Sequence, residues 1–211
     1  MRRLAFAIAT LLAAAAAGET LKTITIDRPA AGLTGIVVKA GVGDVEVAGD
    51  GGRDVAVRVD LTTRGGGFFG GRPTAREIDE IAIDAAVVDG ELHLRLRPEH
   101  RSESRLSERW TVRVPAAFAA TVKLGVGNVT VLDLTGDVRA KLGVGDVRVE
   151  GRFASAGEVR ATSGVGDATL RTPEGHTDGH GFVSHSLRAH GAGSAAVEAE
   201  VGVGDITIRL R

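Results

Sequence analysis

The sequence predicts an all-β protein whose short strands stack as the rungs of a β-solenoid, and three observations support this. One phrase of the pattern Gly-Val-Gly-Asp recurs along the chain. Apolar residues alternate with polar ones on both sides of it, as in strands that bury one face. In three successive copies the second glycines, Gly127, Gly145 and Gly166, are 18 and 21 residues apart, a period typical of repeats that bury their apolar face only against their neighbours. The copies begin at Gly41, Gly125, Gly143, Gly164 and Gly202.

Each copy is expected to form a corner between two short strands. Around the third copy, Leu142 and Val144 precede the pair Gly145-Asp146, while Val147 and Val149 follow it. A straight strand would send one of these apolar pairs into water, because side chains alternate between its two faces. A bend lets both pairs face one core, since Gly takes positive φ without penalty and Asp can bond its own backbone in a turn. The structural turn residues are therefore Gly43, Asp44, Gly127, Asn128, Gly145, Asp146, Gly166, Asp167, Gly204 and Asp205.

An antiparallel sandwich of hairpins with Gly-Asp turns is the competing interpretation. It does not explain why the same side-chain pattern returns at every corner, so we expect stacked rungs in the C-terminal half. The N-terminal half has longer alternating segments, which predict a small flanking sheet with a hairpin that turns at Asp89-Gly90. These segments are 21–26, 33–47, 54–61, 81–88, 91–97 and 110–114.

The first seventeen residues have the features of a secretory signal peptide. Two arginines precede a short apolar run that ends in Ala15-Ala16-Ala17, a suitable cleavage site. Cleavage there would leave residues 18–211 as a single domain, exported to the periplasm or the extracellular space. The chain has no cysteine, which excludes disulfides and a lipid-modified cysteine.

Composition limits the possible partners. The formal net charge of −1 gives no electrostatic reason to expect nucleic acid as a partner. After the signal peptide no apolar run is long enough to span a bilayer, so we expect a chain that does not cross the membrane. The two aromatic residues of a glycine-rich loop, Phe68 and Phe69, are expected to fold back onto the rungs, with a small contact surface as the alternative.

The order of these features resembles a bacterial family of unknown function usually labelled "putative adhesin". The resemblance rests on the early Gly43-Asp44 corner, the strand pair with its loop, the strand that ends at Val114-Pro115, and the lead from Val122 to Leu124 into the repeated corners. It covers essentially the whole mature chain. It implies an exported, right-handed, single-stranded β-helix and brings no catalytic residues, because the family label follows shape rather than chemistry.

Two sets of residues are candidates for metal binding. The corner acids Asp44, Asp146, Asp167 and Asp205 would line one edge of a stack and could hold calcium, although each is more simply explained as the cap of its own turn. Four of the six histidines lie within fifteen residues, and their imidazoles could bind zinc or copper. Their spacings match no compact ligand motif, so a protruding insertion between rungs is the plainer interpretation. The four are His176, His180, His185 and His190.

Catalytic patterns do not emerge from the sequence. The chain contains no G-x-S-x-G, no H-E-x-x-H and no cysteine. We therefore expect no cofactor and predict a noncatalytic structural or adhesion module of the bacterial cell envelope, which contacts an envelope protein or a glycan. A metal-responsive envelope protein using the histidines is the first alternative. An enzyme acting on acidic polysaccharides, with Arg148 and Arg160 beside stacked acids, is the second.

Overall fold

The computed structural model describes residues 20–63, 74–97, 106–179 and 184–211. The predicted signal peptide, the aromatic pair Phe68 and Phe69, and His180 lie outside these ranges. In the described part of the chain, no helix has the length and apolar character needed to cross a membrane.

About three quarters of the described residues belong to strands, which confirms the prediction of an all-β chain. A single 15-stranded sheet contains every strand of the described residues, and Thr74 caps the only described helix by accepting from the Glu77 backbone N–H. The elements are β1(Thr20–Pro29), β2(Gly35–Asp50), β3(Asp54–Thr63), α1(Ala75–Asp79), β4(Ala82–Val88), β5(Glu91–Arg97), β6(Leu106–Pro115), β7(Ala119–Leu134), β8(Val138–Val144), β9(Val147–Gly151), β10(Ala156–Val165), β11(Ala168–Thr172), β12(Gly175–Asp178), β13(His185–His190), β14(Ala195–Val203) and β15(Ile206–Leu210).

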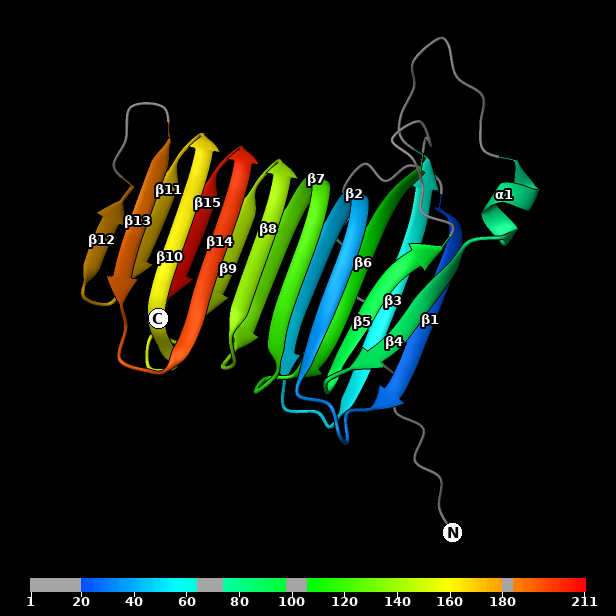
Figure 1. The fold of residues 1–211 in the computed structure, drawn as a ribbon, viewed down its shortest axis with the longest axis horizontal. Coiled ribbons are helices and arrows are strands. Elements are labelled where there is room, and N and C mark those ends of the chain that lie inside the picture. Colours follow the sequence, from blue (N-terminus) through cyan, green and yellow to red (C-terminus); the bar gives the residue numbers. More distant parts are fainter. Residues whose placement is uncertain (1–19, 64–73, 98–105, 180–183) are drawn as a thin grey trace.

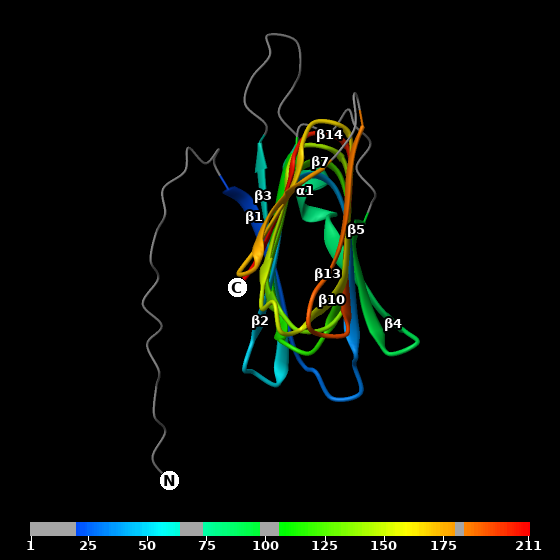
Figure 2. The same cartoon turned by 90° about the vertical axis from the view of Figure 1, so that its left-hand side faces the viewer.

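The sheet folds into two layers because β2 and β7 bend in the middle. Their first halves pair with β5 and β8, and their second halves pair with β6 and β9. The first layer runs in the order β4, β5, β2, β7, β8, β14, β10, β13. The second runs β1, β3, β6, β2, β7, β9, β15, β11, β12. Figure 2 shows the two layers facing each other across a narrow interior.

Five parallel rungs form the body of the molecule, but their spatial order differs from their sequence order. The rung made by β14 and β15, the last in the chain, lies between the β8–β9 rung and the β10–β11 rung. Figure 1 shows β14, in orange-red, between β8 and β10. Although they close the sequence, Ile206 to Leu210 therefore lie inside the stack, between β9 and β11. The edge strands, beyond β11 and β10, are β12 and β13.

The strand pairing differs from an uninterrupted parallel β-helix. The β12 and β13 strands run antiparallel to their neighbours β11 and β10. At the opposite end, β1, β3 and β6 pair antiparallel, as do β4 and β5. The sheet is thus mixed and does not close, so a right-handed, single-stranded β-helix is not established by the pairing. The hairpin predicted at Asp89-Gly90 is confirmed, with φ of 51° and 82° at these residues.

The core lies between the layers and consists mainly of Val, Leu, Ile and Ala. Val129, Val147 and Ile206 occupy equivalent places on adjacent rungs, and each is 1% exposed or less. The expectation that the valine before each Gly-Asp pair also faces the core is wrong at four corners. Val126, Val144, Val165 and Val203 are 40–53% exposed. The whole Gly-Val-Gly-Asp phrase forms the corner, so its valine points outward while Leu124 and Leu142, two residues earlier, are buried.

Glu108 on β6, next to the first rung, has a buried carboxyl group. Glu108 is 6% exposed and accepts hydrogen bonds from Trp110 Nε1 at 2.7 Å and from the Gly41 backbone N–H at 3.3 Å. Burial removes water from the carboxylate and raises the pKa of Glu108, and the two hydrogen bonds offset only part of this effect.

The inward and outward valines of one rung provide a direct test of the corner. Val147→Ala should lower the free energy of unfolding by about 1 to 3 kcal/mol, because it removes buried methyl groups and leaves a cavity. Val144→Ala is the matched control and should change it by less than about 0.5 kcal/mol, since Val144 is 47% exposed. Urea unfolding of both variants measures the difference, and equal losses would contradict the assigned orientation.

Glu108 should make stability depend on pH above the ordinary range of a carboxyl group. Its pKa is higher in the fold than the unfolded value of 4.5, so its stabilising effect is complete below pH 4.5 and is lost as the pH rises through the folded pKa. Glu108→Gln still accepts from Trp110 but does not ionise. The unfolding free energy of the variant, relative to the native chain, should therefore increase from pH 4.5 toward neutrality. Parallel curves for the two proteins would contradict the assignment.

Candidate functional site

The five corners stack in register and depend on glycine. Gly43, Gly127, Gly145, Gly204 and Gly166 have φ between 127° and 140°, a region that side chains disfavour. A Cβ atom on Gly127, Gly145 or Gly204 would also overlap the carbonyl oxygen of the corner glycine on the adjacent rung. Positive φ and the close approach of backbone are the two physical reasons for glycine at these corners.

Three of the four corner acids, Asp44, Asp146 and Asp205, bond to neighbouring rungs rather than to their own turns. Asp146 Oδ1 accepts from the Asp205 backbone N–H at 2.9 Å, and Asp205 Oδ1 accepts from the Asp167 backbone N–H at 2.8 Å. Asn128 donates through its side-chain amide to Asp44 Oδ1 at 2.9 Å. The expectation that each Asp caps its own turn is therefore corrected. These side chains join one rung to the next, and the amide of Asn128 avoids a carboxylate pair.

The three described histidines of the predicted cluster lie on β12 and β13 and do not share a partner. His176 on β12 lies 2.9 Å from Asp178 Oδ1 through Nε2. His185 on β13 lies 2.7 Å from the Gly166 carbonyl oxygen through Nδ1, at the end of the row of corners. His190, at the other end of β13, stands opposite Glu158. Within the described ranges, no three His, Asp or Glu side chains are gathered where they could hold a metal ion.

A row of positive charges crosses the outer face of the first layer. Arg95, Lys39, Lys123 and Lys141 stand directly opposite one another on the adjacent strands β5, β2, β7 and β8. We call these four residues the cationic row. Arg95 Nε bonds to Asp84 Oδ2 at 2.9 Å, and Lys141 Nζ lies 2.7 Å from Glu200 Oε2. Lys39 and Lys123, both exposed, have no ion pair with any described residue.

Like charges directly opposite each other on neighbouring strands destabilise a sheet. In the cationic row, neighbouring cations stand at the inter-strand spacing of about 4.8 Å. The first carboxylate that follows them in the same register is that of Glu200 on β14. A sheet under selection for stability alone gains nothing from this arrangement. The row is therefore the surface feature that most needs a functional explanation.

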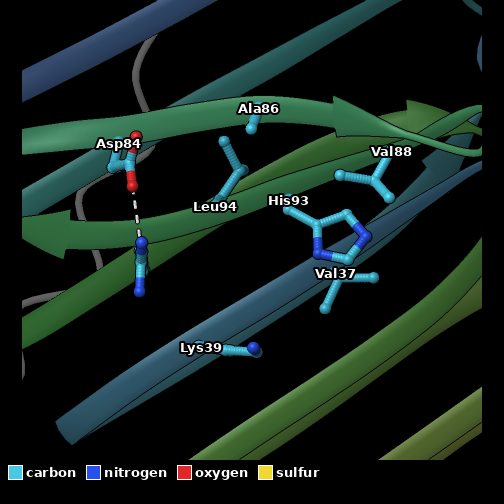
Figure 3. Close-up of a pocket in the computed structure, with 8 residues that line it drawn as sticks. Val37, Lys39, Asp84, Ala86, Val88, His93 and Leu94 are labelled. Carbon is cyan, nitrogen blue, oxygen red and sulfur yellow. Dashed lines mark hydrogen bonds and ion pairs between the residues drawn. The ribbon is translucent and has the colours of Figure 1, made fainter.

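A hollow of about 240 Å³ lies at the Arg95 end of the row, between the hairpin and β2. Figure 3 shows Val37, Lys39 and His93 on one side of it and Asp84, Ala86 and Val88 along β4. The hydrogen bond from Arg95, together with the nearby charge of Arg97, lowers the pKa of Asp84 and keeps it ionised. An apolar wall beside a few polar groups is the usual composition of a small-ligand site.

The lysines of the cationic row also occupy equivalent places in the sequence repeat. Lys39, Lys123 and Lys141 each precede the second glycine of their own copy by four residues. The same place holds Glu200 and Thr162 in the other two copies. Once the register is known, the repeat itself predicts three stacked lysines.

Comparison with known proteins finds similarity in fold alone. No protein-family model matches the chain, and no curated protein matches it. A solved structure described as a putative cell adhesion protein from Clostridium sporogenes is similar over 90% of this chain and 99% of its own, with a TM-score of 0.50 and 16% identity. Two structures described as putative adhesins also match. The one from Bacteroides fragilis covers 89% of this chain and 97% of its own at 14% identity, with a TM-score of 0.33. The one from Parabacteroides distasonis covers 90% and 97% at 9% identity, with a TM-score of 0.30.

The corner geometry predicts that Gly145 accepts no side chain. Gly145→Ala should reduce the unfolding free energy by about 3 kcal/mol or more, because the new Cβ meets backbone and φ is positive. Gly51→Ala is the control, since a Cβ there has no neighbour within 4 Å, and it should change stability by less than about 0.5 kcal/mol. Thermal and urea unfolding of the two variants measure this. A folded Gly145→Ala protein of native stability would contradict the stacked corner.

Proposed function

We propose that this chain is an exported, noncatalytic adhesion module of the bacterial cell envelope that binds an acidic glycan along the cationic row. The observation that carries the proposal is the row itself, with Lys39 and Lys123 opposed in register and without ion pairs among the described residues. The fold shared with the Clostridium sporogenes protein, which is described as a putative cell adhesion protein, supports it.

The chemistry of the row suits a polymer better than a compact ligand. The ammonium group of lysine is a hydrated point charge on a flexible stem, and the four cations follow one line across four strands. A polysaccharide with carboxylate or sulfate groups could lie along this line and neutralise them in succession. Binding would relieve the repulsion between opposed cations, so the contact is stronger than four isolated surface charges would give.

The hollow at the end of the row adds an apolar contact. Val37, Ala86 and Val88 line it beside His93 and Lys39. One sugar ring could lay its C–H face on this wall while its acidic group meets Lys39. The hollow would thereby fix the end of the glycan chain, and the lysines would hold its extension over β7 and β8.

The two alternatives from the sequence have less support in the described structure. A metal-responsive protein would use the four histidines from His176 to His190. Of the three that are described, His176 contacts Asp178, His185 contacts the Gly166 carbonyl oxygen, and His190 stands opposite Glu158. A polysaccharide-active enzyme would use Arg148 and Arg160, which lie on different layers and pair with Glu150 and Glu158. No specific observation favours either, and the adhesion module is the function we propose.

The row is tested by removing its two lysines that lack ion pairs. Lys39→Gln/Lys123→Gln should weaken binding to polygalacturonate roughly tenfold or more at about 0.15 M salt, because each lost contact contributes about 1 kcal/mol. The control Arg53→Gln/Arg113→Gln removes two exposed charges elsewhere and should bind as the native chain does. Calorimetry and retention on the immobilised polymer, with neutral dextran as a blank, give the affinities.

Two results would contradict the proposal. Equal affinity of the lysine variant and the native chain would remove the row as the binding surface. Shortening of the polymer during the incubation, followed by size-exclusion chromatography, would show that the protein is an enzyme rather than a noncatalytic module.

A further inference from the structure

A second positively charged site lies on the other layer, at the rungs nearest β12. An open groove of about 680 Å³ is lined by Arg148 and Glu150 of β9, Arg171 of β11, Arg209 of β15 and the terminal Arg211. We call these four arginines and Glu150 the arginine groove. It draws its residues from three rungs that are neighbours only because the last rung of the chain is inserted between two earlier ones.

The Glu150 carboxylate lies within ion-pair distance of three of the four guanidinium groups. Glu150 accepts from Arg148 Nε at 2.8 Å, while Arg209 Nη1 and Arg211 Nη2 lie 3.6 and 3.5 Å from its oxygens. The hydrogen bonds from Arg148, with the added charges of Arg211 and Arg209, lower the pKa of Glu150, so it stays ionised. Arg171 has no ion pair with any described residue. The four arginine side chains and Glu150 therefore carry a net side-chain charge of +3.

Arg171 and Arg209 stand directly opposite each other on β11 and β15. Arg209 is also poorly satisfied, because its contact with Glu150 is too long for a hydrogen bond. Its Nε is the one buried side-chain polar atom of the described residues without a hydrogen-bond partner. Buried polar groups are normally paired, yet Arg209 Nε has no acceptor and the neighbouring Arg171 has no ion pair with a described residue.

We propose that the arginine groove binds a single tetrahedral oxyanion, a phosphate or sulfate group carried on a larger molecule. A guanidinium group presents paired N–H donors in a fixed planar fork, which matches the oxygens of such an anion. Arg171 and Arg209 would bind it from adjacent strands, and Arg211 would supply further charge. This site is separate from the cationic row, because it lies on the second layer and uses arginine forks rather than a line of lysines.

The proposal is tested with inorganic phosphate, inorganic sulfate and their esters. Calorimetry on the native chain should show saturable binding of one ion per chain, beyond the effect of chloride at the same ionic strength. Glucose 6-phosphate and glucose 6-sulfate distinguish the two sources of the oxyanion, and glucose is the uncharged blank. Binding of either ester supports the site, whereas a response equal to that of chloride would overturn it.

Variants separate the arginine fork from charge alone. Arg171→Gln should weaken binding roughly tenfold, since hydrogen bonds to a charged acceptor are lost. Arg171→Lys keeps the charge but loses the fork, and we expect an affinity well below that of the native chain. Arg113→Gln is the matched control, an exposed arginine on the same layer outside the groove, and should leave binding unchanged.

The proposal would be overturned if the native chain and both Arg171 variants bound the oxyanion with equal affinity. It would also be overturned if Arg113→Gln lost as much affinity as Arg171→Gln. Lys39→Gln/Lys123→Gln should retain binding of the oxyanion. Binding of the oxyanion is measured without polygalacturonate. Loss of the oxyanion proposal and loss of the proposed adhesion function would therefore give different results.

Discussion

The close approach of backbone at the stacked corners is the constraint on which the rest of the structure depends. Each corner glycine has positive φ, and a carbonyl oxygen of the adjacent strand occupies the space of a Cβ atom. This contact fixes the register of all five rungs at one point. Since side chains on neighbouring strands then align position by position, the core valines, the corner acids and the surface charges all form straight rows across the layers.

The same register explains how the last rung can enter the middle of the stack. The β14–β15 rung offers the same corner and the same inward residues as its neighbours, so Ile206 pairs with Val147 on one side and with Ala168 on the other. Its Asp205 accepts from Asp167 and donates its backbone N–H to Asp146. Insertion leaves β12 and β13 as the edge, where antiparallel pairing ends the row of parallel rungs.

The surface rows are where the structure departs from what stability alone requires. Stacked repeat positions bring Lys39, Lys123 and Lys141 together on one layer, while insertion of the last rung brings Arg209 beside Arg171 on the other. Elsewhere on the same faces, opposite charges pair, as Arg139 does with Glu198 at 2.7 Å. The contrast between such pairs and Lys39, Lys123 and Arg171, which have no ion pair with a described residue, is the physical basis for the two proposed binding surfaces.

The sequence by itself determined the all-β class, the five glycine corners and the Asp89-Gly90 hairpin, because turn chemistry and alternation are local properties. In three of the five copies it also contained a lysine four residues before the second glycine. Only the tertiary structure decided the outward direction of Val144, the bonds of Asp146 to the next rung, and the place of the last rung. Rungs with the same pattern present equivalent edges to one another. The sequence therefore specified what each rung looks like, whereas side-chain packing across the whole stack decided which rungs became neighbours.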